Sequence, residues 1–312
     1  MGKEQKVRIK HPTLEDAQAI TDLVALCDIE DIGEPDITLS DVLDMWNSIP
    51  IETDAWIALS VTDEIIGYGF VEVTGANRMD TCVFVHPQFK NQGIGSLLLT
   101  KVEERAHALA NGKDGKQKLM NQISFTNTAA RKLVEDRGYQ FSRLYERMKI
   151  QLEEQLNLHH LPEGLKLQSF QPDHDEETLF TLYDETFRDA WGYTKKDFST
   201  WISQKKGDDY DPGLWFIVWQ DSKPVGFLMS RMQEDGLFID LLGVKRDYRK
   251  HGIGKALLLH IFGIAYECNQ KTILLYVDSD SLTNANRLYQ EVGMWPHSQT
   301  SVYMKQLPWG RV

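Results

Sequence analysis

The sequence predicts an α+β protein of two similar units in tandem. Each unit is expected to have three layers, a mixed and mainly antiparallel sheet with helices on both faces. Residues 85–95, VHPQFKNQGIG, are matched by residues 244–254, VKRDYRKHGIG, and Gly252 follows Gly93 by 159 positions. In both copies an apolar strand-like run precedes the glycine turn and an apolar helix-like run follows it. The same offset relates Trp56 to Trp215 and Gly67 to Gly226.

Composition supports two globular units and excludes several classes of protein. A length of 312 residues suits two domains of roughly 150 residues each. The chain is 42% hydrophobic and 26% charged, and no segment approaches the roughly 18 apolar residues that span a bilayer. A net charge of −12 argues against nucleic-acid binding, which needs a surplus of Lys and Arg. The three cysteines have no metal-like spacing, and a charged N-terminus without a secretory signal favours the cytoplasm.

Each half is predicted to run through the same order of elements. A strand and a helical region come first, then two strands joined by a tight turn, the strand that ends in the glycine turn, a long helix, a strand, a short helix and a final strand. In the first half we expect strands at 7–10, 56–61, 65–70, 123–125 and 145–150, with the long helix at 96–109. In the second half we expect strands at 165–168, 215–219, 224–228, 273–277 and 301–305, with the long helix at 255–268.

The short helices end at Gly138 and Gly293, which are 155 positions apart. The second half therefore has four residues fewer between its glycine turn and the end of its short helix. The polar loop 111–116 is the expected place of this difference. We expect the final strand of each half to end its own unit. The boundary is predicted near 155–164, which gives units at 1–154 and 163–312.

The second glycine turn combines three features that suit a pyrophosphate. Gly252 and Gly254 allow the backbone to approach a ligand without a Cβ atom in the way. The helix that follows directs its free N–H groups and the positive end of its dipole at the same point. Arg249 and Lys255 add positive charge. For one copy alone, an ordinary strand-to-helix turn that uses glycine for its geometry remains an equal alternative.

The spacing Arg249-x-x-Gly252-x-Gly254 after Val244 resembles the acetyl-CoA signature of the GNAT superfamily of N-acetyltransferases. Residues 284–294, NANRLYQEVGM, resemble that family's closing helix, with Met294 in place of an aromatic residue. The resemblance covers nearly the whole chain as two tandem units. Together with the segments 187–192 and 211–215, the tandem arrangement most resembles the mycothiol synthase group.

This resemblance implies acetyl-CoA as co-substrate and no metal. The pantetheine arm is expected beside the strand that ends at Val244, and the turn is expected to hold the pyrophosphate. The implied coenzyme contacts in the second half are Leu242, Gly243, Val244, Arg249, Lys250, His251, Gly252, Ile253, Gly254 and Lys255. Their counterparts in the first half are Val83, Phe84, Val85, Lys90, Asn91, Gln92, Gly93, Ile94 and Gly95.

Tyr289 is the candidate donor of a proton to the departing thiolate. A phenol of pKa about 10 suits a thiol leaving group of pKa about 8.5. A buried aromatic residue without a catalytic role is the alternative. Four positions before Gly138 the first half has Val134, which cannot donate a proton. It also has Lys90 where the second half has Arg249, and lysine lacks the guanidinium fork. We therefore expect catalysis in the second half, with the first half a coenzyme-binding or structural relic.

Asp240 is the candidate general base. The family often places a glutamate six residues before the valine, and that position is Phe238 here. Asp240 lies two residues on, on the same strand face by the alternation of side chains. An aspartate among apolar neighbours is costly unless it has a partner or a task. Glu234 and Asp235 lie just before the strand, where solvated turn carboxylates are the better interpretation.

The preferred function is acetyl transfer from acetyl-CoA to a primary amine of a small molecule by direct attack, in a monomer or homodimer. One alternative is a non-catalytic protein that binds or senses acyl-CoA, and the presence of Tyr289 and Arg249 favours the enzyme over it. Another alternative is acetylation of a peptide or protein, which needs an open groove for the acceptor. We expect neither nucleic acid nor membrane as a partner.

Overall fold

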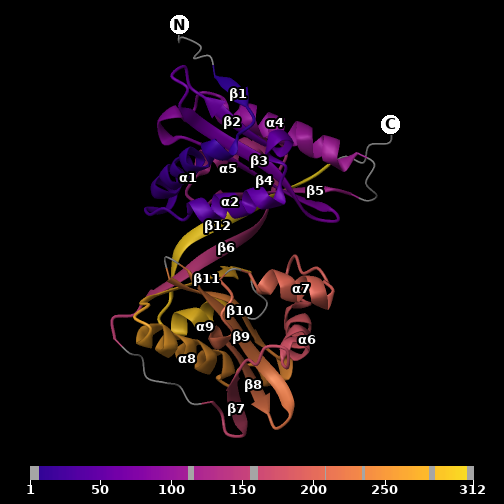
Figure 1. Ribbon diagram of the computed structural model, residues 1–312, viewed down its shortest axis with the longest axis vertical. Helices are drawn as coiled ribbons and strands as arrows, with labels where there is room; N and C mark the ends of the chain where they lie inside the picture. Colours follow the sequence, from indigo (N-terminus) through magenta and orange to yellow (C-terminus); the bar gives the residue numbers. More distant parts are fainter. Residues whose placement is uncertain are drawn as a thin grey trace. The chain divides into compact units, whose positions relative to one another are not determined.

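The computed structural model describes residues 7–111, 116–154, 161–207, 209–233, 236–280 and 285–307 (Figure 1). The chain divides into two compact units. Unit 1 comprises Met1–Tyr145 with Ser298–Val312, and unit 2 comprises Glu146–His297. Each unit has a mixed sheet with helices packed on it, which confirms the predicted fold class.

The strands of unit 1 follow the order β1-β2-β3-β4-β5-β12 in the sheet. The strands are β1 Arg8–Lys10, β2 Ala55–Leu59, β3 Ile65–Gly75, β4 Arg78–Val85, β5 Lys118–Ser124 and β12 Trp295–Gln306. The helices are η1 Leu14–Asp16, α1 Ala17–Ile32, α2 Leu39–Ser48, α3 Ile51–Asp54, η2 Pro87–Phe89, α4 Ile94–Ala110 and α5 Thr128–Asp136. These strands pair antiparallel except for β4 and β5, which are parallel.

Unit 2 repeats this arrangement in the order β6-β11-β10-β9-β8-β7. The strands are β6 Gln140–Gln151, β7 Leu165–Ser169, β8 Trp215–Gln220, β9 Lys223–Gln233, β10 Gly236–Val244 and β11 Thr272–Asp278. The helices are α6 Glu176–Phe187, α7 Phe198–Lys205, η3 Pro212–Leu214, η4 Arg246–Tyr248, α8 Ile253–Glu267 and α9 Ala285–Glu291. Here the parallel pair is β10 with β11.

Alternating side chains of the strands bury the two faces of each sheet under different helices. In unit 1, Ile57 and Tyr68 pack with α1 and α2, whereas Trp56 and Ile66 pack with α4. In unit 2, Figure 1 shows α6 and α7 on one face of the sheet and α8 and α9 on the other. Burial of apolar area on both faces is the main source of stability in such a layered fold.

The parallel strands separate before the glycine turn in both units. Pairing between β4 and β5 ends at Thr81↔Asn121, although β4 continues to Val85. Pairing between β10 and β11 consists of Leu237↔Ile273 and Phe238↔Leu274, although β10 continues to Val244. Each sheet therefore opens into a wedge beside the strand that leads to the turn.

The last strand of the chain does not end the unit expected from sequence. The expectation that strand 301–305 belongs with the second half is wrong, because β12 pairs with β5 from Thr300↔Ser124 to Gln306↔Lys118. Lys305 Nζ also donates to Glu103 Oε1 on α4 at 2.7 Å. β6, the last strand of the first half, lies beside β11. An apolar pattern tells which face of a strand is buried, but it does not tell which of two similar sheet edges the strand joins.

Trp56 and Trp215, matched in sequence by the offset of 159, are not equivalent in structure. Ala58 lies opposite Gly67, whereas Val218 lies opposite Gly226, so β8 is displaced by one residue relative to β2. A one-residue shift turns side chains to the other face of a sheet. The offset of 159 therefore does not place the two tryptophans on the same face of their sheets, although both side chains are buried.

Candidate active site

The two glycine turns share one backbone conformation. Asn91 and Lys250 have φ of 61° and 64°, and Gly93 and Gly252 both have φ of 82°. The strand before each turn is anchored alike, by Lys245 N to Val225 O at 2.9 Å in unit 2 and by the matching bond at 3.0 Å in unit 1. Positive φ favours glycine, which explains why it recurs at this position. Each turn leads directly into a long helix, α4 or α8, whose first N–H groups face the turn.

A second pair of glycines brings the short helix against the start of the long helix. A Cβ atom at Gly254 would lie 2.9 Å from Leu288 Cδ2, and one at Gly95 would lie 3.3 Å from Leu133 Cδ2. Leu288 and Leu133 are 155 positions apart, the offset that relates Gly293 to Gly138. The neighbours that follow them, Tyr289 and Val134, are therefore structural counterparts beside the glycine turn.

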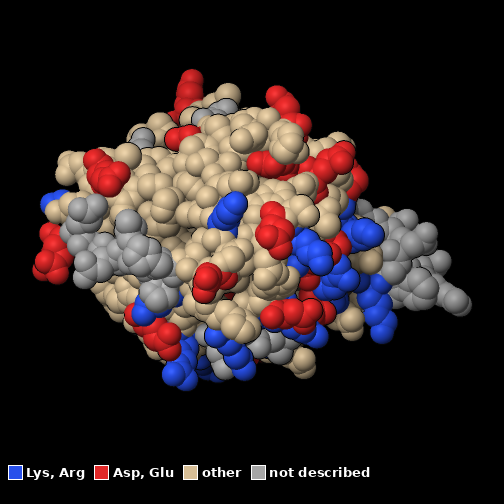
Figure 2. Space-filling view, turned by 90° about the horizontal axis from the view of Figure 1, so that it is seen from below, with Lys and Arg blue, Asp and Glu red and all other residues tan. Residues whose placement is uncertain are grey.

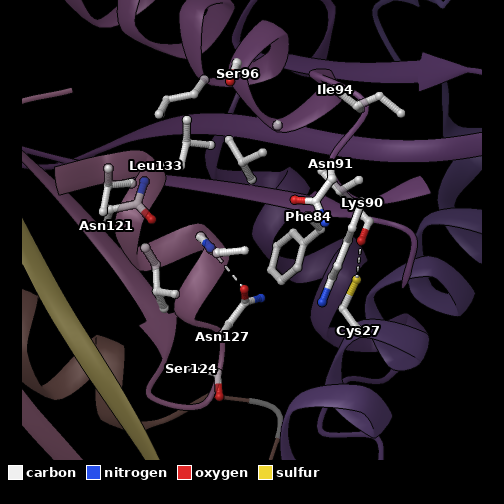
Figure 3. A pocket seen from close by; sticks show the side chains of 18 of the residues that line it. Cys27, Phe84, Lys90, Asn91, Ile94, Ser96, Asn121, Ser124, Asn127 and Leu133 are labelled. Atoms are coloured by element: carbon white, nitrogen blue, oxygen red, sulfur yellow. Dashed lines mark hydrogen bonds between the residues drawn. The ribbon is translucent and has the colours of Figure 1, made fainter. Parts of the chain in front are cut away.

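A cavity of about 260 Å³ occupies the wedge of unit 1 (Figure 3). It lies between the free end of β4, β5, the glycine turn and α5. Of the nine coenzyme contacts predicted in the first half, eight line this cavity and Gln92 does not. The eight are Val83, Phe84, Val85, Lys90, Asn91, Gly93, Ile94 and Gly95. Val134, the counterpart of Tyr289, also lines it, so this position faces the space that a ligand would occupy.

Tyr289 is 8% exposed on α9, and burial raises the pKa of its hydroxyl to about 12. Within the described part of the chain this hydroxyl makes no hydrogen bond. The phenol therefore holds its proton at neutral pH, and no acceptor among the described residues competes for that proton. Because its counterpart Val134 lines the cavity of unit 1, Tyr289 lies at a position from which a buried side chain can contact a ligand.

Three cationic side chains of the unit 2 turn, Arg249, Lys250 and Lys255, have no acidic partner among the described residues. Arg249 Nε donates to the carbonyl oxygen of Val244 at 2.9 Å, which fixes the side chain across the base of the turn. The predicted contacts of unit 2 lie in two stretches, 242–244 at the free end of β10 and 249–255 in the turn and the start of α8.

Asp240 lies at an irregularity of β10, where pairing with β9 shifts between Ile239 and Leu241. Arg231 Nε is 3.3 Å from Asp240 Oδ1, and the Arg231 guanidinium lies 5.4 Å from the centre of the Phe238 ring. Asp240 and Phe238 therefore meet the same side chain. Burial raises the pKa of Asp240, an effect that Arg231 and Lys205 oppose.

Arg231 and Lys205 are cationic neighbours of the candidate base Asp240 that sequence reasoning missed. Arg231 Nη1 also pairs with Asp209 Oδ2 at 3.0 Å. Burial lowers the pKa of Lys205, and the negative charge of Asp240 opposes that shift. In the described chain Lys205 has neither a hydrogen bond nor an ion pair. No local motif marks these residues, because they come from α7 and β9. Glu234 and Asp235, the other candidate bases, lie outside the described residues.

The described residues give no sign of a metal site or a membrane-spanning helix, and the face in Figure 2 is of mixed charge. Within the described residues, no group of three or more His, Cys, Asp or Glu side chains is placed to hold a metal ion. None of the described helices is long and apolar enough to cross a bilayer. On the face seen in Figure 2, Lys and Arg lie beside Asp and Glu, and most of the surface is neutral.

Models of acetyltransferase families match segments of both units. The model of the "Acetyltransferase (GNAT) family" matches residues 176–294, and that of the "Acetyltransferase (GNAT) domain" matches residues 52–141. A mycothiol acetyltransferase of Thermobispora bispora is 27% identical over 241 residues, covering 74% of this chain and 77% of that protein. A mycothiol acetyltransferase of Streptomyces coelicolor is 25% identical over 256 residues, covering 77% and 76%.

Two solved structures match nearly the whole chain. A GCN5-related N-acetyltransferase from Sphaerobacter thermophilus has a TM-score of 0.87 at 27% identity, covering 98% of this chain and 96% of that one. A tandem GNAT protein from the clavulanic acid biosynthesis pathway has a TM-score of 0.75 at 14% identity, covering 96% and 98%. At that identity the second likeness concerns the fold alone.

Proposed function

The chain belongs to the GNAT family of acetyltransferases, and from this premise we propose that unit 2 transfers the acetyl group of acetyl-CoA to a primary amine of a small molecule. The observation that carries the proposal is the turn of unit 2. Arg249, Lys250 and Lys255 surround it without acidic partners in the described chain, and Tyr289 stands beside it on α9. A cationic turn next to a protonated phenol suits the binding of an anionic thioester donor and the protonation of a thiolate.

The residues of unit 2 fit acetyl-CoA. After Phe238 the edge of β10 is released from β11, so Leu242, Gly243 and Val244 can pair with the amides of the pantetheine arm. The N–H groups at the start of α8, together with Arg249, suit the pyrophosphate. The coenzyme supplies the activated acetyl thioester, and the chain supplies its placement.

Two side chains have the properties that the proton transfers require. Tyr289 would donate its proton to the sulfur as the carbon–sulfur bond breaks, and its pKa of about 12 keeps the hydroxyl protonated at neutral pH. Asp240 would accept the proton that the amine loses when its nitrogen forms the new bond to the acetyl carbon. Its raised pKa improves it as a base, and Arg231 keeps its carboxylate oriented.

Unit 1 is proposed to be non-catalytic. Its wedge and turn match those of unit 2 in backbone, so residues 83–85 and 90–95 remain proposed coenzyme contacts. Val134 replaces the proton donor, and a valine side chain has no proton to give. The names of the relatives in Thermobispora and Streptomyces support a small-molecule acceptor for unit 2 without identifying it.

Release of free coenzyme A from acetyl-CoA tests the proposal. The full chain would be assayed against small amines, amino sugars, amino acids and peptides, with an amine-free reaction as the control. Release above that control with a small amine supports the proposed acceptor class. Release with peptides alone contradicts it. Absence of release with every amine, in a preparation that binds acetyl-CoA, favours the sensing protein.

A further inference from the structure

The lysine of the unit 1 turn is held by two carboxylates. Lys90 forms an ion pair with Glu30 and lies 4.0 Å from Asp31, both near the end of α1. Asp31 is held on its other side by Asn127 Nδ2 at 3.1 Å. Lys90, Asp31 and Asn127 all line the cavity, so a chain of polar contacts joins the glycine turn to α1 and α5. Figure 3 shows Lys90 extending from the turn toward Cys27, another α1 residue of the cavity wall.

The turn of unit 2 lacks this arrangement. At the offset of 159, Glu30 corresponds to Asp189 and Asp31 corresponds to Ala190. Asp189 pairs with Arg246, three residues before Arg249, at 2.8 Å. One carboxylate is therefore directed elsewhere and the other is replaced by a methyl group. Two turns with the same backbone thus differ in charge, because Arg249 has no acidic partner in the described part of the chain whereas Lys90 lies between two acids.

An anion in the unit 1 turn would meet an unfavourable field. With its side chains ionised, the group Lys90, Glu30 and Asp31 has a net charge of −1. Asp31 is half-buried at the cavity wall, where the charge of a carboxylate is screened less than in bulk water. A pyrophosphate would have to displace Lys90 from its partners or accept their repulsion. The rest of the cavity, with apolar side chains and neutral amides, is suited to the uncharged pantetheine arm.

We propose that Glu30 and Asp31 form a charge gate on the coenzyme site of unit 1. The gate holds Lys90 and disfavours the pyrophosphate, so unit 1 binds coenzyme A much more weakly than unit 2. Pantetheine, which has no phosphate, is not subject to the gate. This inference rests on the proposed coenzyme A binding of unit 2.

Calorimetric titration of the full chain with coenzyme A tests the gate. The unmodified chain is expected to show one tight site per chain. The variant Glu30→Gln with Asp31→Asn is expected to gain a second site, with unit 1 affinity rising roughly tenfold or more as two negative charges are removed. Adding Lys90→Met to that variant should remove the second site. Should the double variant fail to fold, Glu30→Gln alone changes a side chain that is 44% exposed and should give a smaller gain.

Two controls separate a charge gate from other effects. Glu185→Gln with Asp189→Asn removes the acidic partners of Lys245 and Arg246 in unit 2, and it should leave the stoichiometry at one. Pantetheine should bind the gate variant and the unmodified chain equally. An equal rise for pantetheine would overturn the gate, because it would show that the cavity had opened sterically.

The outcomes also separate this inference from the proposed function. Two tight sites in the unmodified chain, or one site in the gate variant, would overturn the gate and leave the function of unit 2 standing. No tight site in the unmodified chain would contradict the proposed function itself.

Discussion

Leu288 lies so close to Gly254 that a Cβ atom at this glycine would be 2.9 Å from Leu288 Cδ2, and this contact seats α9 against the start of α8. Gly254→Ala should therefore displace α9, which carries Tyr289, and destabilise the protein by about 1 kcal/mol. The measurements are thermal unfolding and turnover, and both are expected to fall.

Gly95→Ala is the matched control, because its Cβ atom would meet Leu133 Cδ2 at a more tolerable 3.3 Å. An alanine in the first turn of a helix gains about 0.5–1 kcal/mol over glycine. Gly95→Ala should thus be neutral or slightly stabilising, with turnover unchanged. Equal effects of the two substitutions would show that the contact does not position α9.

Tyr289→Phe should lower turnover roughly a hundredfold or more and leave acetyl-CoA affinity nearly unchanged. The ring remains to fill its place in the core, so the loss reports the hydroxyl alone. Steady-state kinetics with a direct binding measurement separates the two effects. Full turnover in this variant would mean that solvent or another group protonates the thiolate.

The pH profile of turnover should show a proton donor that stays protonated far into the alkaline range. Burial raises the pKa of Tyr289 to about 12, so its protonated form persists as the pH rises through 10. Below neutrality, turnover should fall as the pH drops through the raised pKa of Asp240, because the base becomes protonated. An alkaline loss of turnover centred below pH 10 that Tyr289→Phe abolishes would contradict this assignment.

Asp240→Asn should lower turnover by about two orders of magnitude and remove the acidic limb of the pH profile. Asp209→Asn is the control, since Asp209 pairs with the same Arg231 but is more exposed. This control should keep both turnover and the acidic limb. If the two variants behave alike, Asp240 acts only as a structural partner of Arg231.

Sequence predicted the features that depend on local conformation or on periodicity. The turns recur because Gly93 and Gly252 need the same positive φ, and the structure gives both 82°. The counterpart of Tyr289 followed from the offset between Gly138 and Gly293, which the contacts of Leu133 and Leu288 reproduce.

Features that depend on pairing between distant segments escaped prediction. The same apolar pattern allows β12 to complete either sheet, and the register of Trp215 depends on a connection between β8 and β9 that, counted between the matched pairs, is one residue shorter than the one between β2 and β3. The acidic partners of Lys90 lie about 60 residues earlier in the chain, and Lys205 and Arg231 are brought to Asp240 only by the packing of α7 and β9. Ion pairs of this kind are a property of the folded chain.

The central claim is that one of two nearly identical turns carries catalysis, and the pair Gly252→Val and Gly93→Val tests it most directly. Both glycines have φ of 82°, so valine strains both turns alike, by about 1–2 kcal/mol. Turnover of acetyl-CoA with an accepted amine should be abolished by Gly252→Val and retained by Gly93→Val, in preparations shown to be folded. Equal loss from both substitutions would contradict a single active unit.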